Sequence, residues 1–183
     1  MIVLLARTRS AVCSGRVLSE LLTTSSQRSP VTILRDEQRI LRGVHIEGQG
    51  DFNVSASHAG ELRLFAISTR PVGCDLERTG SLEELPHWAR SAVSGDCFEP
   101  VSTWTTIEGV AKAKRLTLLK MRTLCRTEQM RLVYGRDSVT VVVNGVAESF
   151  GIWRPPMERG LVASVVVAQE PEVACSIKTE ATP

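Results

Sequence analysis

The last third of the chain carries the pattern that most restricts its fold. Four runs rich in β-branched and aliphatic residues are separated by short turn signals, and they cover residues 130–134, 138–143, 146–152 and 161–168. Asn144-Gly145, between two of these runs, is a strong signal for a two-residue hairpin, because both residues tolerate the positive φ angles that such a turn requires. The pattern therefore predicts an antiparallel sheet in this part of the chain.

The residues before this sheet combine further strand patterns with helical ones. Alternating or β-branched runs predict strands at residues 2–6, 31–34, 54–57, 62–67 and 72–76. Apolar spacing and capping signals predict helices at residues 16–22, 81–93 and 100–119. Strands with a helix, followed by a long helix and a second set of strands, predict an α+β fold.

We expect this fold to be divided into an N-terminal half, residues 1–95, and a C-terminal half, residues 96–170. Residues 171–183 are expected to form a loose tail, in which residues 173–177 could add an edge strand. Residues 35–50 are expected to form a loop with a short strand. The order of elements suggests an internal pseudo-repeat, but the identity between the halves is too low to establish one.

Composition excludes several classes of protein. A net charge of +2 and an aromatic content of 4% argue against a nucleic-acid surface. The five cysteines are scattered and form no Cys-x-x-Cys pair, which argues against a zinc knuckle or a disulfide framework and favours a reducing compartment. Met1–Ala6 is too short for a signal peptide, and no run approaches the ~18 apolar residues of a membrane span. We expect a cytoplasmic protein with no membrane partner.

Two carboxylates, Asp75 and Glu77, end the apolar run that begins at Pro71. In a strand, residues i and i+2 share a face, so both carboxylates would point the same way. Carboxylates that lie this close repel each other unless a cation sits between them, and Mg²⁺ is a hard ion that takes oxygen ligands. The alternative is a strand that runs out into solvent and ends in two acidic residues.

Trp104, Glu108 and Lys112 form a second candidate group at i, i+4 and i+8, which is one face of the expected helix at residues 100–119. Glu108 and Lys112 could form an ordinary surface ion pair. Trp104 on the same stripe is a large apolar residue, and this argues against a purely solvent-exposed face.

A third candidate is Ser57-His58, which precedes Ala59-Gly60. In a turn, a hydroxyl and a ring N–H at these positions can contact a phosphate, although a lone histidine is more often structural. The chain contains no Gly-x-Ser-x-Gly elbow, no P-loop and no Gly-x-Gly-x-x-Gly. His45 and His87 show no metal-ligand spacing.

Taken in order, Phe52–Gly60, Pro71–Glu77 and Trp104–Lys112 resemble the surfactin-synthetase-associated class of 4′-phosphopantetheinyl transferases. In that family a Ser-His-Ser/Ala-Gly motif precedes a Val-Gly-x-Asp-x-Glu strand and a Trp-Thr-x-Lys-Glu-x-x-x-Lys helix. The resemblance covers residues 52–112, and residues 161–168 are similar to the closing strands of the family. It implies a pseudo-dimer of two similar α+β halves, with the active site in the cleft between them.

The resemblance also implies an activity. Such enzymes transfer the phosphopantetheine arm of coenzyme A to a serine of an apo acyl or peptidyl carrier protein, in polyketide or nonribosomal peptide biosynthesis, and release 3′,5′-ADP. Asp75, Glu77 and Glu108 would hold Mg²⁺, which also binds the coenzyme A pyrophosphate.

In this scheme Glu108, or a metal-bound water, would take the serine proton, and Lys112 would meet the charge of the leaving group. Ser57 and His58 would contact the nucleotide phosphates, and Asp75 would face the pyrophosphate. Whether Glu77 binds the metal directly or through water is left open. A chain that is itself a pseudo-dimer needs no second copy, and we expect a monomer.

The chain departs from the family pattern in several places, among them the absence of the glycine usually found just beyond the helix lysine. Ile107 replaces the usual lysine, and Gly109 replaces alanine or serine at a cost of about 1 kcal/mol in a helix interior. The Gly-Lys-Pro motif that touches the nucleotide is not recognisable, and Arg39 or Arg42 would stand in its place.

Two alternatives to the transferase therefore stay open: a catalytically impaired relative that binds coenzyme A or the carrier, and a metal-dependent hydrolase of a pyrophosphate bond. Three basic residues near the expected site are candidates for steering an acidic carrier, Lys114, Arg115 and Lys120.

Overall fold

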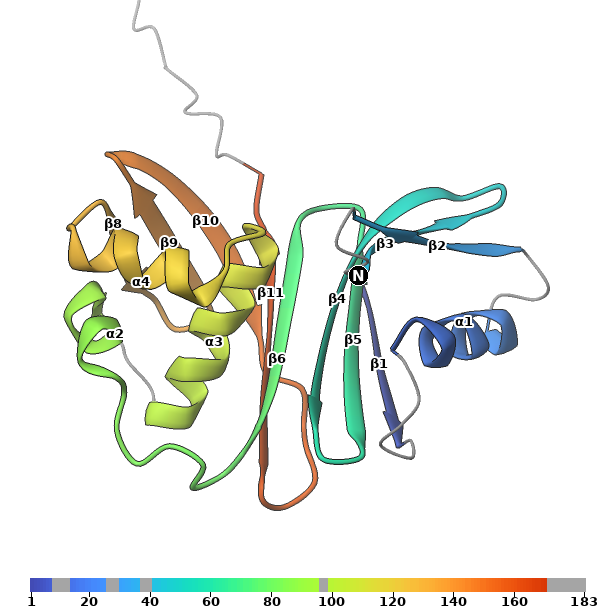
Figure 1. Cartoon of the computed structure of the whole chain (residues 1–183), viewed down its shortest axis with the longest axis horizontal. Coiled ribbons are helices and arrows are strands. Elements are labelled where there is room, and N and C mark those ends of the chain that lie inside the picture. The colour runs from blue at the N-terminus through green and yellow to red at the C-terminus, as the bar shows by residue number, and fades with distance from the viewer. Residues whose placement is uncertain (8–13, 26–29, 37–40, 96–98, 171–183) are drawn as a thin grey trace, which may run out of the picture.

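The computed structural model describes residues 1–7, 14–25, 30–36, 41–95 and 99–170. Within these residues the fold is α+β, as the sequence predicts, with two sheets and four helices (Figure 1). The expected tail at residues 171–183, with its edge strand, lies outside the described part of the chain.

The first sheet contains five antiparallel strands in the order β1-β5-β4-β3-β2. The strands are β1 (Ile2–Arg7), β2 (Val31–Arg35), β3 (Leu41–Ile46), β4 (Gly50–Ala59) and β5 (Leu62–Ser68). Helix α1 (Ser14–Ser25) covers one face, where its Val17 and Leu18 pack in one cluster with Val44 and Phe65. This helix buries an apolar stripe against the apolar side of the sheet.

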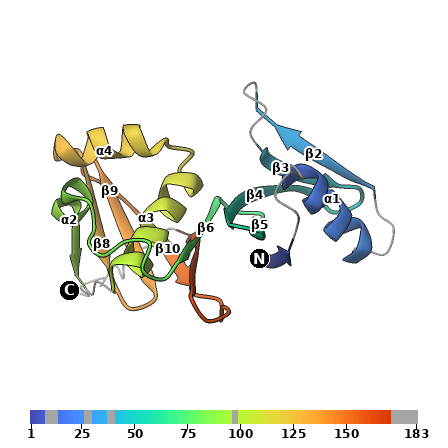
Figure 2. The ribbon, with the colours of Figure 1, turned by 60° about the horizontal axis from the view of Figure 1, so that its bottom comes forward.

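The second sheet contains six strands in the order β6-β11-β10-β9-β8-β7, all antiparallel to their neighbours except the parallel pair β7–β8. The strands are β6 (Val72–Arg78), β7 (Val93–Gly95), β8 (Met130–Tyr134), β9 (Ser138–Val143), β10 (Val146–Trp153) and β11 (Leu161–Ala168). Helices α2 (His87–Ala92), α3 (Pro100–Ala113) and α4 (Leu118–Arg126) pack with β8–β11 around one apolar core (Figures 1 and 2).

Strand β5 is buried on both faces and joins the two sheets. Phe65 and Ile67 belong to the core beneath α1, whereas Leu64 and Ala66 pack with β6 and β11. Alternation along the strand explains the two sets, because successive side chains point to opposite faces. The chain changes sheet at residues 69–71, which is ahead of the division after residue 95 that the sequence suggests.

The four strands of the last third are confirmed, and the hairpin between β9 and β10 turns at Asn144 (φ 49°) and Gly145 (φ 82°). Two positive φ angles at Asn-Gly are the geometry that a two-residue hairpin needs. The expected loop at residues 35–50 contains β3, as predicted, and a turn that leads directly into β4.

The bounds predicted for the helices at residues 81–93 and 100–119 are wrong in part. The helix expected at residues 81–93 is confined to α2, because Pro86 lies at its N-cap and restricts the preceding residue to extended conformations. The helix expected at residues 100–119 ends at Ala113, and a second helix begins after Thr117, whose hydroxyl accepts a hydrogen bond from Lys120 N–H (3.1 Å). This N-cap starts α4, a separate helix that the sequence pattern did not indicate.

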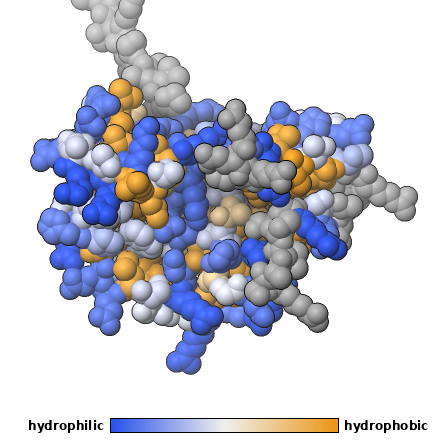
Figure 3. All heavy atoms as spheres, in the orientation of Figure 1, coloured by the Kyte–Doolittle hydropathy of each residue, from blue (hydrophilic) through white to orange (hydrophobic). Residues whose placement is uncertain are grey.

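None of the helices in the described ranges is both long and apolar enough to cross a bilayer. The face drawn in Figure 3 is largely hydrophilic, and its apolar groups form small separate patches. Single exposed apolar residues such as Leu119 and Val146 are normal on a protein surface.

Candidate functional site

Helix α3 touches β6 backbone to backbone. A Cβ atom on Gly73 would lie 1.8 Å from the Gly109 carbonyl oxygen, and a Cβ on Gly109 would lie 3.3 Å from a Val166 methyl group. Only glycine at Gly73 allows this approach, and the small residue at Gly109 fits the same contact. The departure from the family pattern at Gly109 therefore has a packing reason. The close approach places the polar side of α3 over the carboxylates of β6.

Three carboxylates meet at this contact. Asp75 and Glu77 lie on β6 and Glu108 on α3, and one oxygen of each lies within 4.8 Å of the others. Asp75 is buried, with only 2% of its surface exposed, and the other two are half-buried. The acidic pair of β6 therefore does not run out into solvent.

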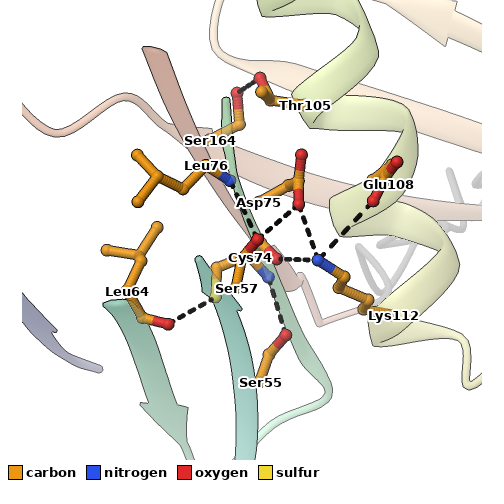
Figure 4. A network of polar contacts seen from close by, with 10 residues as sticks. All are labelled: Ser55, Ser57, Leu64, Cys74, Asp75, Leu76, Thr105, Glu108, Lys112 and Ser164. Carbon is orange, nitrogen blue, oxygen red and sulfur yellow. Dashed lines mark hydrogen bonds and ion pairs between the residues drawn. The ribbon is translucent and has the colours of Figure 1, made fainter. Parts of the chain in front are cut away.

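Lys112 supplies the positive charge beside these carboxylates (Figure 4). Its Nζ donates to Asp75 Oδ1 at 2.7 Å and to the Cys74 carbonyl oxygen at 3.0 Å, and it lies 3.8 Å from Glu108 Oε2. The carboxylate nearest to this ammonium is thus Asp75 on β6, and not Glu108, which lies one turn before Lys112 on α3. Lys112 is a member of the cluster and not only half of an exposed helical ion pair.

Strand β4 of the first sheet contributes two serines. Ser57 Oγ donates to Asp75 Oδ1 (2.7 Å) and accepts from Leu76 N–H (3.3 Å), while Ser55 Oγ accepts from Cys74 N–H (3.0 Å) (Figure 4). Both hydroxyls fix the backbone of β6 around Asp75. The site is consequently built from both sheets.

One buried carboxylate oxygen in the cluster, Asp75 Oδ2, has no hydrogen-bond partner among the residues that the structure describes. Asp75 Oδ1 accepts two hydrogen bonds, but Oδ2 is buried and accepts none from the described residues. A buried acceptor without a partner is costly, and three carboxylates face a single ammonium here. A hard divalent cation with oxygen ligands would satisfy this oxygen and balance the charge, so the residues present fit Mg²⁺.

Burial raises the pKa of Glu108 from an ordinary value of 4.5 to about 7. The negative charge of Asp75 acts in the same direction, Lys112 opposes it, and Glu77 adds a smaller increase. Burial also raises the pKa of the Cys74 thiol to about 11. Cys74 therefore stays protonated and packs as a small apolar residue, so it is not a candidate nucleophile.

We expect the metal-free protein to lose stability as the pH rises from about 4.5 to about 7. Between the unfolded and folded pKa values of Glu108, the folded state holds more protons than the unfolded state, so the free energy of unfolding falls with pH and levels off above 7. Urea unfolding in EDTA between pH 4.5 and 8 measures this, with Glu108→Gln as the reference. Parallel curves for the two proteins would contradict the assignment.

Two further predicted binding residues, His58 and Arg42, do not contact the carboxylate cluster. His58 is exposed on the face of β4 opposite to Ser57, because β4 continues as a strand through Ala59 where the sequence suggested a turn. Arg42 pairs with Asp36 (2.7 Å). Arg39 lies outside the described residues.

Arg42 borders a cavity of about 200 Å³ that Arg115 also lines, and Arg115 donates to Asn53 Oδ1 at 3.3 Å. Of the other suggested steering residues, Lys114 is paired with Glu148. Lys120 is exposed.

Sequence reasoning missed three parts of the site. Ser55 could have been found, since it shares a strand face with Ser57 at i, i+2. Gly73 could have been suspected as a glycine inside a strand pattern. The buried hydrogen bond between Thr105 and Ser164 (2.8 Å), which fastens α3 to β11, carries no local signal because its partners are far apart in the chain.

The arrangement is chemically suited to hold a divalent cation beside an ammonium group, which is what the transfer or cleavage of a phosphoryl group requires. It offers a carboxylate, Glu108, that can accept a proton, and a cation, Lys112, that can meet negative charge. In comparisons with known proteins, the chain matches no family model and no curated protein.

Proposed function

We propose that this protein is a Mg²⁺-dependent 4′-phosphopantetheinyl transferase that acts on apo acyl or peptidyl carrier proteins. The observation that carries the proposal is the meeting of Asp75, Glu77 and Glu108 around a buried, unpartnered carboxylate oxygen, with Lys112 beside them. These are the residues that the family pattern marks for metal binding and catalysis.

In this proposal the two sheets are the halves of a pseudo-dimer, and the active-site cleft lies between them. The origin of the site residues supports a cleft between the two halves, because Ser57 belongs to the first sheet and Asp75 to the second. We place the division between the halves at the change of sheet, residues 69–71.

The reaction joins the serine oxygen of the carrier to the phosphorus that bears the pantetheine. The anhydride P–O bond breaks with its electron pair, and 3′,5′-ADP leaves. Bound Mg²⁺ would neutralise charge on the phosphate oxygens. Glu108 accepts the serine proton, and the ammonium of Lys112 stabilises the leaving phosphate. Ser57 holds Asp75 in place through its hydrogen bond.

We assign the nucleotide phosphates of coenzyme A to the cavity that Arg42 and Arg115 line. The Asn53 amide and the Asp51 carboxylate also border it, so the two guanidinium groups would have to outweigh one negative charge there. This assignment gives Arg115 a role in nucleotide binding in place of carrier steering. Under this assignment His58 does not contact the nucleotide phosphates, since His58 lies on the face of β4 opposite to Ser57.

Two of the departures from the family pattern leave the metal and catalytic residues in place, whereas the missing Gly-Lys-Pro motif concerns the binding of the nucleotide. Ile107 is fully buried in the core beneath α3, and Gly109 lies at the contact with β6. Both have packing reasons, which weakens the case for a catalytically impaired relative. A metal-dependent hydrolase stays a second candidate, because the three carboxylates would serve equally well with water as the nucleophile.

The test is to mix the protein with apo-carrier, coenzyme A and Mg²⁺ and to follow the mass of the carrier. We expect the gain of one phosphopantetheine, no gain in EDTA, and no gain on a carrier whose acceptor serine is replaced by alanine. If a panel of acyl and peptidyl carriers stays apo, the proposal is wrong. Free phosphopantetheine formed without carrier would identify the hydrolase.

A further inference from the structure

A second basic cavity lies at the end of β6, on the side away from α3. Its volume is about 290 Å³, and it is lined by Ala59, Leu62, Arg78, Arg159, Gly160 and Leu161. The lining comes from the turn between β4 and β5, the end of β6 and the turn between β10 and β11, which lie side by side at the lower edge of Figure 1. The cavity therefore spans both sheets.

Arg78 is placed by the alternation of β6. Asp75 and Glu77 face α3, so Leu76 and Arg78 face the opposite side, where Leu76 packs in the core between the sheets. Arg78 continues this row at the open end of that core. Its guanidinium lies against Gly60, where a Cβ atom would come within 3.1 Å of a guanidinium nitrogen. The glycine, with φ 62°, leaves room for the side chain across the turn.

Arg159 reaches the cavity from the facing turn, which is fastened in place. Thr79 N–H donates to the Gly160 carbonyl (3.0 Å), and Leu161 N–H donates to the Glu158 carbonyl (3.1 Å). The Glu158 carboxylate is engaged by Arg7, whose guanidinium nitrogen lies 3.1 Å from both of its oxygens. The nearest acid of this turn is thus already paired with another arginine.

Among the described residues that line this cavity there are two guanidinium groups and no carboxylate, and the other side chains are apolar. Arginine presents a planar fork of donors that matches the oxygens of phosphate and carboxylate groups. Leu62 and Leu161 are partly buried, pack against the apolar core between the sheets and provide a surface for a hydrocarbon group.

We infer that this cavity binds an oxyanion, a phosphate or a carboxylate, whose attached apolar part rests on Leu62 and Leu161. The bound group would join the turn of the first sheet to the turn of the second sheet. It would therefore stabilise the contact between the sheets. The inference does not depend on the transferase activity, and it gives this end of the molecule a ligand site of its own.

The test uses inorganic phosphate, phenyl phosphate and hexanoate in EDTA, with the arginine Nε–Hε signals followed by NMR. We expect the signals of Arg78 and Arg159, assigned from the single glutamine variants, to shift together with each probe. Phenyl phosphate should bind several-fold more tightly than inorganic phosphate. At ten times the dissociation constant, the melting temperature should rise by roughly 3–5 °C.

The Arg78→Gln/Arg159→Gln double variant should bind each probe at least tenfold more weakly. The matched control is Arg126→Gln/Arg131→Gln, which removes the same charge beside a different cavity and should bind each probe as tightly as the wild-type protein does. An Asp75→Asn variant should also keep the wild-type affinity for the probes, which separates this site from the proposed metal centre. The inference would be overturned if the Arg78 and Arg159 signals did not shift, or if the Arg78→Gln/Arg159→Gln variant bound the probes as tightly as the wild-type protein.

Discussion

An Asp75→Asn variant is expected to lose kcat/KM for the proposed phosphopantetheine transfer by about a thousandfold, which corresponds to about 4 kcal/mol of transition-state stabilisation. The substitution keeps the size of the side chain but removes the charge that holds Lys112 at 2.7 Å. It also removes the buried Oδ2 as an anionic ligand, leaving Glu77 and Glu108 as the carboxylates of the cluster. Binding of a divalent cation should weaken together with activity.

Isothermal titration with Mg²⁺ and the carrier assay measure these two effects, and circular dichroism checks that the variant is folded. Glu148→Gln is the matched control, because Glu148 is also a carboxylate paired with a lysine, Lys114, but it lies outside the metal cluster. The control should keep Mg²⁺ binding and activity close to wild type. An Asp75→Asn protein with more than a tenth of wild-type activity would remove Asp75 from the metal site.

The second large effect is expected for Gly73→Ala. Its new methyl group would lie 1.8 Å from the Gly109 carbonyl oxygen and 2.7 Å from the Ala113 amide nitrogen, and both are backbone atoms that cannot rotate away. Helix α3 would have to move off β6, so packing and the carboxylate cluster would be lost together. We expect destabilisation of about 4 kcal/mol, or a fall in melting temperature of roughly 10 °C, with loss of Mg²⁺ binding.

Gly151→Ala is the control for this prediction. Gly151 is also a strand glycine, in β10, but a Cβ there would meet only the end of the flexible Gln169 side chain, at 3.2 Å. Its melting temperature should change by no more than about 2 °C. If thermal unfolding shows the two variants to be equally stable, the close contact between β6 and α3 does not support the site.

The strands were predictable because their signals are local. The turn at Asn144-Gly145 and the β-branched runs around it depend only on adjacent residues, and β8–β11 follow them closely. The helices were less predictable because their ends depend on single residues that compete with the apolar pattern. Pro86 delays α2, and the Thr117 N-cap restarts a helix after Ala113.

Between α3 and α4, Arg115 adopts a positive φ of 55°. Nothing in the residue type predicts this conformation, which glycine or asparagine would favour. The packing of the two helices on the second sheet imposes it and directs Arg115 towards Asn53 of the first sheet. A residue that the sequence assigned to carrier steering thus borders the same cavity as Arg42.

The sequence by itself determined the α+β class, the strands of the last third, and the candidate residues Asp75, Glu77, Glu108 and Lys112. Only the tertiary structure decided that these residues meet, that Ser57 joins them and that His58 does not. The physical reason is that sequence periodicity is a local signal. It indicates on which side of its own helix or strand a residue lies, but not which other element packs against that side. Here the glycine contact between β6 and α3 decides it.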